Sequence, residues 1–154
     1  MLEHRGWLTD ARVLDLFAGS GALAIEALSR GAREAILVDA APAAVRALRE
    51  NVTASGLAAR ARIVPTSVAS ALRMLGREGV TVDGVLADPP YGEGQVQRVV
   101  DGVVAAGILA ADGWIALEHA VDEAPSAPPG FAVAVSRRHG RTAITLLRRE
   151  EEAA

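Results

Sequence analysis

The chain has no cysteine among its 154 residues. This absence excludes a disulfide framework and a thiolate metal site, and we expect no metal centre. Aromatic residues are also scarce, at 3% of the sequence, whereas 51% of the residues are hydrophobic. That hydrophobic content is sufficient for one core in a chain of this length, so we expect a single domain covering residues 1–154.

Long apolar runs are missing as well. No segment approaches the roughly 20 consecutive apolar residues of a membrane-spanning helix. The first residues include Glu3, His4 and Arg5, and Asp10 and Arg12 follow, a pattern unlike a signal peptide. The expectation is a cytoplasmic protein that does not interact with membranes.

Lysine is absent, so all 16 basic residues are arginine. The net charge of −3 argues against a protein that coats polyanions without selectivity. Arginines nevertheless gather near the end of the chain, where the guanidinium fork suits bidentate contact with phosphate. This group consists of Arg137, Arg138, Arg141, Arg148 and Arg149. A solvated hairpin turn is the alternative interpretation for its first three members.

Short apolar runs alternate with helical patterns along the chain. The strand candidates are residues 12–16, 34–39, 61–65, 82–87 and 113–118, and the helix candidates are 21–30, 42–55, 68–76 and 95–106. Nearly continuous apolar strands are typical of a sheet covered by helices on both faces. The alternation therefore predicts an α/β fold with a doubly wound, mostly parallel sheet.

The last part of the sequence has a different pattern. Two strand-like runs, residues 132–138 and 142–149, flank His139-Gly140, a pair typical of a tight turn. This arrangement predicts an antiparallel hairpin added to the edge of the parallel sheet.

The first chemical motif is Asp15-Leu16-Phe17-Ala18-Gly19-Ser20-Gly21, between the first strand and the first helix. Glycine allows a positive φ and lets a ligand approach the backbone without meeting a Cβ. The helix amino terminus adds free N–H groups. Asp39, after the second strand, is suited to accept both hydroxyls of a ribose.

The same glycines also satisfy the dinucleotide fingerprint G-x-G-x-x-G/A, with Asp39 as its acid. Asp15 favours another ligand, because a carboxylate there repels a phosphate and attracts an ammonium group. S-adenosylmethionine has an ammonium group, a ribose and no phosphate. A capping role for either acid is the alternative: Asp15 on the turn, or Asp39 on the helix at residues 42–55.

The second motif is Asp88-Pro89-Pro90-Tyr91, directly after the strand candidate at residues 82–87. The Asp88 carboxylate and the Pro89 carbonyl can accept hydrogen bonds from the two N–H groups of a planar exocyclic amine. The prolines hold that carbonyl in place. Tyr91 can stack on a base taken out of its helix. The alternative is a Pro-Pro turn capped by Asp88. With the glycine turn, the motif predicts methyl transfer to an exocyclic amine, with orientation supplying much of the rate.

The sequence resembles the bacterial small-subunit ribosomal RNA guanine-N2 methyltransferases of the RsmD type, a class I methyltransferase family. Residues 13–21, 25–32 and 86–91 show the resemblance most clearly, and it extends over residues 11–148. It implies a Rossmann-like sheet of seven strands, the last two of them antiparallel. It also implies a guanine at residues 88–91, with Glu118 as an acid near the active-site face or, alternatively, a strand-end surface acid.

Two departures from the family pattern are apparent. Family members usually begin with a hairpin and a helix, and residues 1–4 resemble only the end of that helix, so we expect this extension to be missing. The family also often has an acid after the third strand that meets the adenine. Here Ser67 takes that position, with the Val68 N–H available to the ring. The predicted cofactor-binding residues are Asp15, Phe17, Ala18, Gly19, Gly21, Asp39, Ala40, Ser67 and Val68.

The leading prediction is methyl transfer from S-adenosyl-L-methionine to the N2 of a guanine in 16S rRNA, within the small ribosomal subunit. Asp88, Pro89, Pro90 and Tyr91 are the predicted catalytic residues, and Arg137, Arg138 and Arg141 are the predicted RNA-binding residues. An adenine-N6 DNA methyltransferase uses the same chemistry, although no separate region is large enough for duplex readout. Glutamine-N5 methylation is less favoured because Asp88 replaces the usual asparagine. A non-catalytic S-adenosylmethionine-binding domain also remains open.

Overall fold

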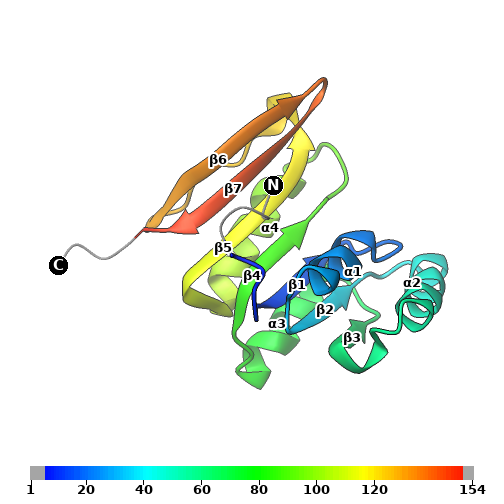
Figure 1. The fold of residues 1–154 in the computed structure, drawn as a ribbon. Coiled ribbons are helices and arrows are strands. Elements are labelled where there is room, and N and C mark those ends of the chain that lie inside the picture. The colour runs from blue at the N-terminus through cyan, green and yellow to red at the C-terminus, as the bar shows by residue number, and fades with distance from the viewer. Residues whose placement is uncertain (1–5, 151–154) are drawn as a thin grey trace.

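The computed structural model describes residues 6–150, so the expected helix end at residues 1–4 lies outside the described residues. A seven-stranded sheet in the order β3-β2-β1-β4-β5-β7-β6 forms the centre of the fold (Figure 1). The strands are β1 (Arg12–Leu16), β2 (Glu34–Val38), β3 (Ala61–Val64), β4 (Val82–Ala87), β5 (Leu109–Ala120), β6 (Phe131–His139) and β7 (Thr142–Arg149). The first five are parallel, and β7 runs antiparallel to β5 and β6. The predicted fold class is confirmed.

Helices cover both faces of this sheet. Within the described residues, the α-helices are α1 (Ala22–Ser29), α2 (Pro42–Ala54), α3 (Val68–Glu78) and α4 (Gln95–Ala106), and the short 3₁₀ helices are η2 (Ala58–Arg60) and η3 (Val121–Glu123). Successive strand side chains alternate between the faces. Leu14 and Leu16 pack in the cluster that includes α3 and α4, whereas Val13 packs in the cluster that includes α1 and α2. No described helix is long and apolar enough to cross a membrane.

Several element boundaries differ from the sequence prediction. The first helix begins at Ala22, because Gly21 has a φ of 85° and lies outside the helical region. The third helix continues past Gly76 to Glu78. A glycine at position 76 allows α4 to pack closely, since a Cβ there would lie 3.0 Å from the Ala106 carbonyl oxygen. β5 begins at Leu109, before an irregularity in its pairing with β4.

The sheet topology defines one special edge. The strand order reverses between β1 and β4, where Leu16 pairs with Ala87 at the carboxyl ends of the two strands. In open α/β sheets, ligands bind outside the carboxyl ends at this reversal. The β6–β7 hairpin reaches the same edge, because Ala120 at the end of β5 pairs with Thr142 at the start of β7 (Figure 1).

Candidate active site

The glycine turn follows β1 directly, and its two glycines serve different purposes. Gly19 has a φ of 56° and Gly21 a φ of 85°, both in the left-handed region that favours glycine. A Cβ on Gly19 would meet no atom within 4 Å, whereas a Cβ on Gly21 would overlap the Leu48 side chain of α2. Gly19 therefore keeps space open beside the backbone, and Gly21 allows α2 to pack closely.

Phe17 also has a left-handed backbone, with a φ of 60°. This conformation is unfavourable for a residue with a Cβ and is held only where surrounding contacts require it. Half-buried Phe17 packs against the core on the α3 and α4 face. The Ala18 N–H donates to the Val38 carbonyl at 2.9 Å, which ties the turn to β2.

Asp39 connects the ends of β1 and β2. Its Oδ2 accepts a hydrogen bond from the Gly19 N–H at 2.9 Å, and its Oδ1 accepts one from the Ala41 N–H at 2.9 Å. Each carboxylate oxygen can accept a further hydrogen bond. These contacts therefore orient Asp39 and leave it able to accept hydrogen bonds from a ligand. Ala40 lies exposed next to it.

Asn51 of α2 is a further support for the turn that the sequence analysis missed. Its Nδ2 donates to the Ser20 carbonyl at 2.9 Å. The two residues are 31 positions apart, and no local pattern indicates their contact. The turn is therefore held by groups from both β2 and α2.

Asp15 is enclosed beneath this turn, with 1% of its surface exposed. Neither carboxylate oxygen has a hydrogen-bond partner in the described part of the chain. Burial, the main cause, raises the pKa of Asp15 to about 7; the Ala24 amide partly lowers it, and the charges of Asp39 and Asp88 raise it further. The predicted contact with an ammonium group stays a prediction, since protein surrounds the carboxyl in this structure.

Ser67 lies at the start of α3, after β3. Its Oγ accepts a hydrogen bond from the Ser70 N–H at 3.2 Å and caps the helix. The hydroxyl oxygen still has a free lone pair, so the predicted contact with an adenine amino group is compatible with this cap. Val68, the first helical residue, is half-buried.

The second motif occupies the loop between β4 and α4. Pro89 is buried, Pro90 is exposed, and the Tyr91 side chain is prominent, with 61% of its surface exposed. Although Asp88 as a residue is exposed, partial burial of its carboxyl raises its pKa. A raised pKa makes a carboxylate a better proton acceptor near neutral pH.

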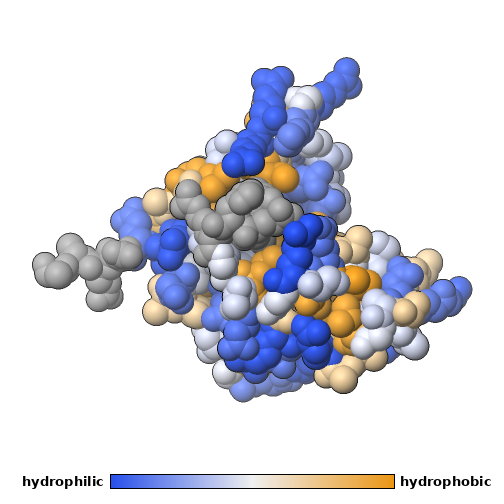
Figure 2. All heavy atoms as spheres, viewed as in Figure 1, coloured by the Kyte–Doolittle hydropathy of each residue, from blue (hydrophilic) through white to orange (hydrophobic). Residues whose placement is uncertain are grey.

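The three predicted RNA-binding arginines are exposed at the end of the β6–β7 hairpin, the hydrophilic projection at the top of Figure 2. Arg138 donates from Nε to the Gly140 carbonyl at 2.9 Å. The Val121 N–H donates to the Arg141 carbonyl at 3.1 Å and thereby ties the hairpin end to η3. Arg137 lies on the same strand as Arg138. Half-buried Glu118 lies at the same edge, in β5.

The structure thus brings the two motifs and the arginines to one edge of the sheet. An acid-lined edge with an open glycine backbone suits a ligand that has cationic groups and no phosphate, as S-adenosylmethionine has. Asp15 and Asp88 have no ion pair within the described residues, and no described group of acids and histidines could hold a metal ion.

Comparisons with known proteins agree with this site. A family model described as Conserved hypothetical protein 95 matches residues 1–148. Ribosomal RNA small subunit methyltransferase D from Escherichia coli (strain K12) is 33% identical over 146 residues, which are 94% of this chain and 72% of that protein. The chain belongs to the RsmD-type methyltransferase family.

Solved structures support the same assignment. The structure of yhhF from Escherichia coli matches with a TM-score of 0.85 and 32% identity, covering 94% of this chain and 80% of that chain. A conserved hypothetical protein from Streptococcus pyogenes matches with a TM-score of 0.83 and 28% identity, covering 91% and 86%. The predicted RsmD-type resemblance, the Rossmann-like sheet and S-adenosylmethionine as cofactor are confirmed.

Proposed function

We propose that this RsmD-type methyltransferase transfers a methyl group from S-adenosylmethionine to the exocyclic N2 of a guanine in 16S rRNA. The observation that carries the proposal is the position of Asp88, at the carboxyl end of β4 and next to the glycine turn that follows β1. The name of the Escherichia coli relative supports RNA of the small ribosomal subunit as the substrate. We also propose that the enzyme is cytoplasmic and consists of a single domain.

The cofactor would lie against the glycine turn. Gly19 offers open space for it, and Asp39 would accept hydrogen bonds from its ribose in addition to those from Gly19 and Ala41. Ala40, Ser67 and the Val68 N–H would surround the adenine. When bound, S-adenosylmethionine supplies a methyl group on a positively charged sulfur.

The Asp88 loop would hold the target amine. The Asp88 carboxylate and the Pro89 carbonyl would accept hydrogen bonds from its two N–H groups, and the exposed Tyr91 ring would stack on the base. When the amine nitrogen forms its bond to the methyl carbon, the carbon–sulfur bond breaks and its electron pair stays on sulfur. The nitrogen then releases a proton, and we assign Asp88 as its acceptor because burial raises the pKa of this carboxyl.

The hairpin arginines would contact the RNA phosphates. Replacing Arg137, Arg138 and Arg141 with alanine should weaken RNA binding and reduce its salt dependence, by a slope of roughly 0.7 to 0.9 for each phosphate that is no longer neutralised. Arg62→Ala is a matched control, because Arg62 is paired with Glu78 at the opposite end of the sheet. Equal salt slopes in the triple variant and the wild type would contradict this role.

The test is transfer of labelled methyl to small ribosomal subunits that lack the modification, with free ribosomal RNA and DNA assayed in parallel. Nucleoside analysis should find N2-methylguanine in the RNA and none in the Asp88→Ala reaction. Label on adenine N6 in DNA would favour the alternative enzyme. Bound S-adenosylhomocysteine with no label on any substrate would favour a non-catalytic binding domain.

A further inference from the structure

A carboxylate from the segment that directly follows β5 is hydrogen-bonded to the loop that contains the proposed catalytic motif. Glu123, the last residue of η3, accepts hydrogen bonds from the Gly92 N–H on both of its oxygens, at 2.8 and 3.0 Å. Gly92 directly follows Tyr91, so the contact lies one residue from the proposed base-stacking ring. Within the described residues, no other side chain is hydrogen-bonded to the loop at residues 88–94.

This loop needs an external restraint. Gly92, Glu93 and Gly94 all have left-handed backbones, with φ values of 84°, 58° and 68°. The conformation is unfavourable at Glu93, which has a Cβ, and persists only where the surrounding structure enforces it. Glu123 supplies such a contact at the first residue of the three.

The segment that carries Glu123 is itself held at two points. On one side, the Val121 N–H donates to the Arg141 carbonyl of the hairpin at 3.1 Å. On the other side, Ser126 and the Gln97 side chain of α4 exchange hydrogen bonds of 2.8 and 3.2 Å. The segment that presents the carboxylate is therefore anchored to both the hairpin and α4.

We propose that Glu123 is a positioning residue for methyl transfer: it fixes Gly92 and so determines where Tyr91, Asp88 and the Pro89 carbonyl stand. In the proposed function the RNA phosphates pass near Glu123, and like charges repel. A carboxylate at this position is therefore unfavourable unless it performs a local task. The reaction itself rests on the proposed function, but the position of the loop does not.

The chain offers a matched control next to Glu123. Asp122 belongs to the same 3₁₀ helix, is exposed, and makes no hydrogen bond or ion pair with the described residues. Glu123→Ala and Asp122→Ala remove the same charge from nearly the same place, and only the first removes the contact with Gly92. Glu123→Gln keeps the length of the side chain and one carbonyl acceptor.

The first readout does not depend on activity. Tyr91 is the only tyrosine in the chain, so incorporation of 3-fluorotyrosine gives a single ¹⁹F resonance that reports on this loop. In the wild type and in Asp122→Ala the resonance should have the same position and width. In Glu123→Ala it should move towards the position of free fluorotyrosine, and Glu123→Gln should lie between. An unchanged resonance in Glu123→Ala would overturn the proposal.

The second readout is kinetic. Misplacing reacting groups by about 1 Å can lower a rate by roughly 100-fold, so Glu123→Ala should lower kcat by about 10- to 100-fold. The KM for S-adenosylmethionine should stay within about twofold, because Glu123 makes no hydrogen bond or ion pair with the glycine turn in the described part of the chain. Asp122→Ala should keep kcat within about twofold, and equal losses in both variants would contradict the proposal. If the wild type methylates nothing, the proposed function fails while the fluorine spectrum still decides the role of Glu123.

Discussion

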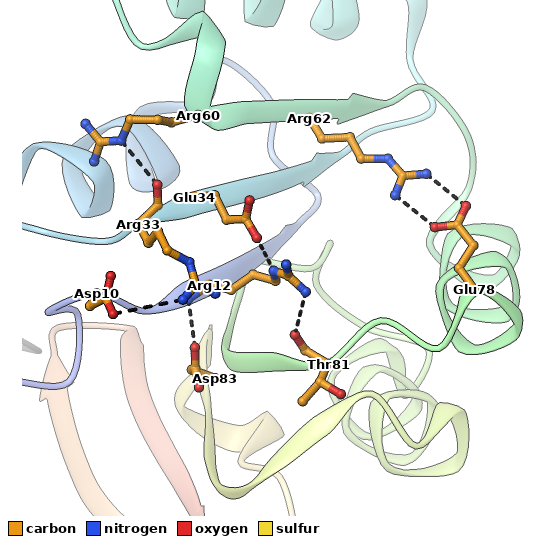
Figure 3. Close-up of polar contacts among 9 residues, drawn as sticks. All are labelled: Asp10, Arg12, Arg33, Glu34, Arg60, Arg62, Glu78, Thr81 and Asp83. Atoms are coloured by element: carbon orange, nitrogen blue, oxygen red, sulfur yellow. Dashed lines mark hydrogen bonds and ion pairs between the residues drawn. The ribbon is translucent and has the colours of Figure 1, made fainter.

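The two ends of the parallel strands use their charged residues in opposite ways. At the amino ends, the Arg12 side chain is paired with Glu34 and with the Thr81 carbonyl, and Arg62 is paired with Glu78 at 2.9 Å (Figure 3). At the carboxyl ends, the carboxyls of Asp15 and Asp88 have no such partner within residues 6–150.

The difference supports the proposed position of the active site. Desolvating a carboxylate without a partner is costly, and the cost appears as a raised pKa in both Asp15 and Asp88. At the amino ends the same kinds of residue satisfy one another and stabilise the fold. The unpaired acids lie at the edge of the sheet to which the proposed function assigns the active site.

Surface shape alone does not point to the proposed site. A hollow of about 260 Å³ lies at the amino ends, lined in part by Trp7, Trp114 and Arg148. The two indole rings stack with their centroids 6.4 Å apart, and the Arg148 Cζ lies 5.6 Å from the centroid of the Trp7 ring. These three side chains therefore pack against one another. A hollow lined in part by side chains that pair with one another offers fewer free groups to a ligand than an edge with unpaired acids.

The sharpest test of the comparison uses the two ends of β4. Asp88→Asn should lower kcat by roughly 10²- to 10⁴-fold, because the proton acceptor is removed. Asp83→Asn, at the start of the same strand, should leave kcat within about twofold, since Asp83 accepts a hydrogen bond only from the Arg12 backbone N–H at 2.8 Å. Methyl-transfer kinetics on both variants provide the measurement, and similar losses would remove the distinction between the ends.

Asp15 should make stability depend on pH. Its pKa is about 7 in the folded state against an ordinary value of 3.8, so the folded state binds the proton more tightly than the unfolded state. The resulting stabilisation is complete below pH 3.8 and is lost as pH rises through about 7. At 1.36 kcal/mol per pKa unit, the loss is roughly 4 kcal/mol.

Asp15→Asn removes this titration. Urea unfolding between pH 4 and pH 8 should show a smaller decline in the free energy of unfolding for the variant than for the wild type. Relative to wild type, the variant should be most stable at pH 8. Identical pH profiles for the two proteins would show that the carboxyl is not desolvated as described.

The ends of β2 provide a third comparison. Asp39→Asn breaks one of two backbone hydrogen bonds and removes the charge beside the ribose, so affinity for S-adenosylhomocysteine should fall by roughly 10- to 100-fold. Glu34→Gln, at the start of the strand, should leave this affinity unchanged. Calorimetric titration of both variants measures the difference, and an equal fall in both would argue against a ribose site at Asp39.

The smallest effect is expected at the start of β1. Arg12→Ala removes the ion pair with Glu34 and the hydrogen bond to the Thr81 carbonyl, both partly exposed. The free energy of unfolding should fall by about 1 kcal/mol, with no change in S-adenosylhomocysteine affinity. Chemical denaturation checks the first value. A lowered affinity would show that the two ends of the sheet are coupled.

Much of this edge could be predicted from the sequence because its acids lie near the ends of strands or directly after them. Asp15, Asp39 and Asp88 each lie at or just after the end of an apolar run, and the carboxyl ends of parallel strands meet at one edge. The contacts of Asn51 with Ser20 and of Glu123 with Gly92 could not be predicted. Both pairs are 31 residues apart and depend on how helices and loops pack.

The burial of Asp15 and the space around the two glycines could not be predicted from the sequence either. The pattern indicates that Asp15 lies near the end of a strand, but its near-complete burial depends on how the helices pack over β1. The motif contains Gly19 and Gly21, but it does not show that Gly19 leaves open space whereas Gly21 allows the Leu48 side chain to pack against the turn. These properties arise from tertiary packing.

A crystal structure with bound S-adenosylhomocysteine tests the central claim most directly. The ribose hydroxyls should be hydrogen-bonded to Asp39, the ligand should lie against Gly19, and its sulfur should face the loop that begins at Asp88. A ligand bound at the amino ends of the strands, or one that leaves Asp39 and Gly19 uncontacted, would contradict the assignment of the active site.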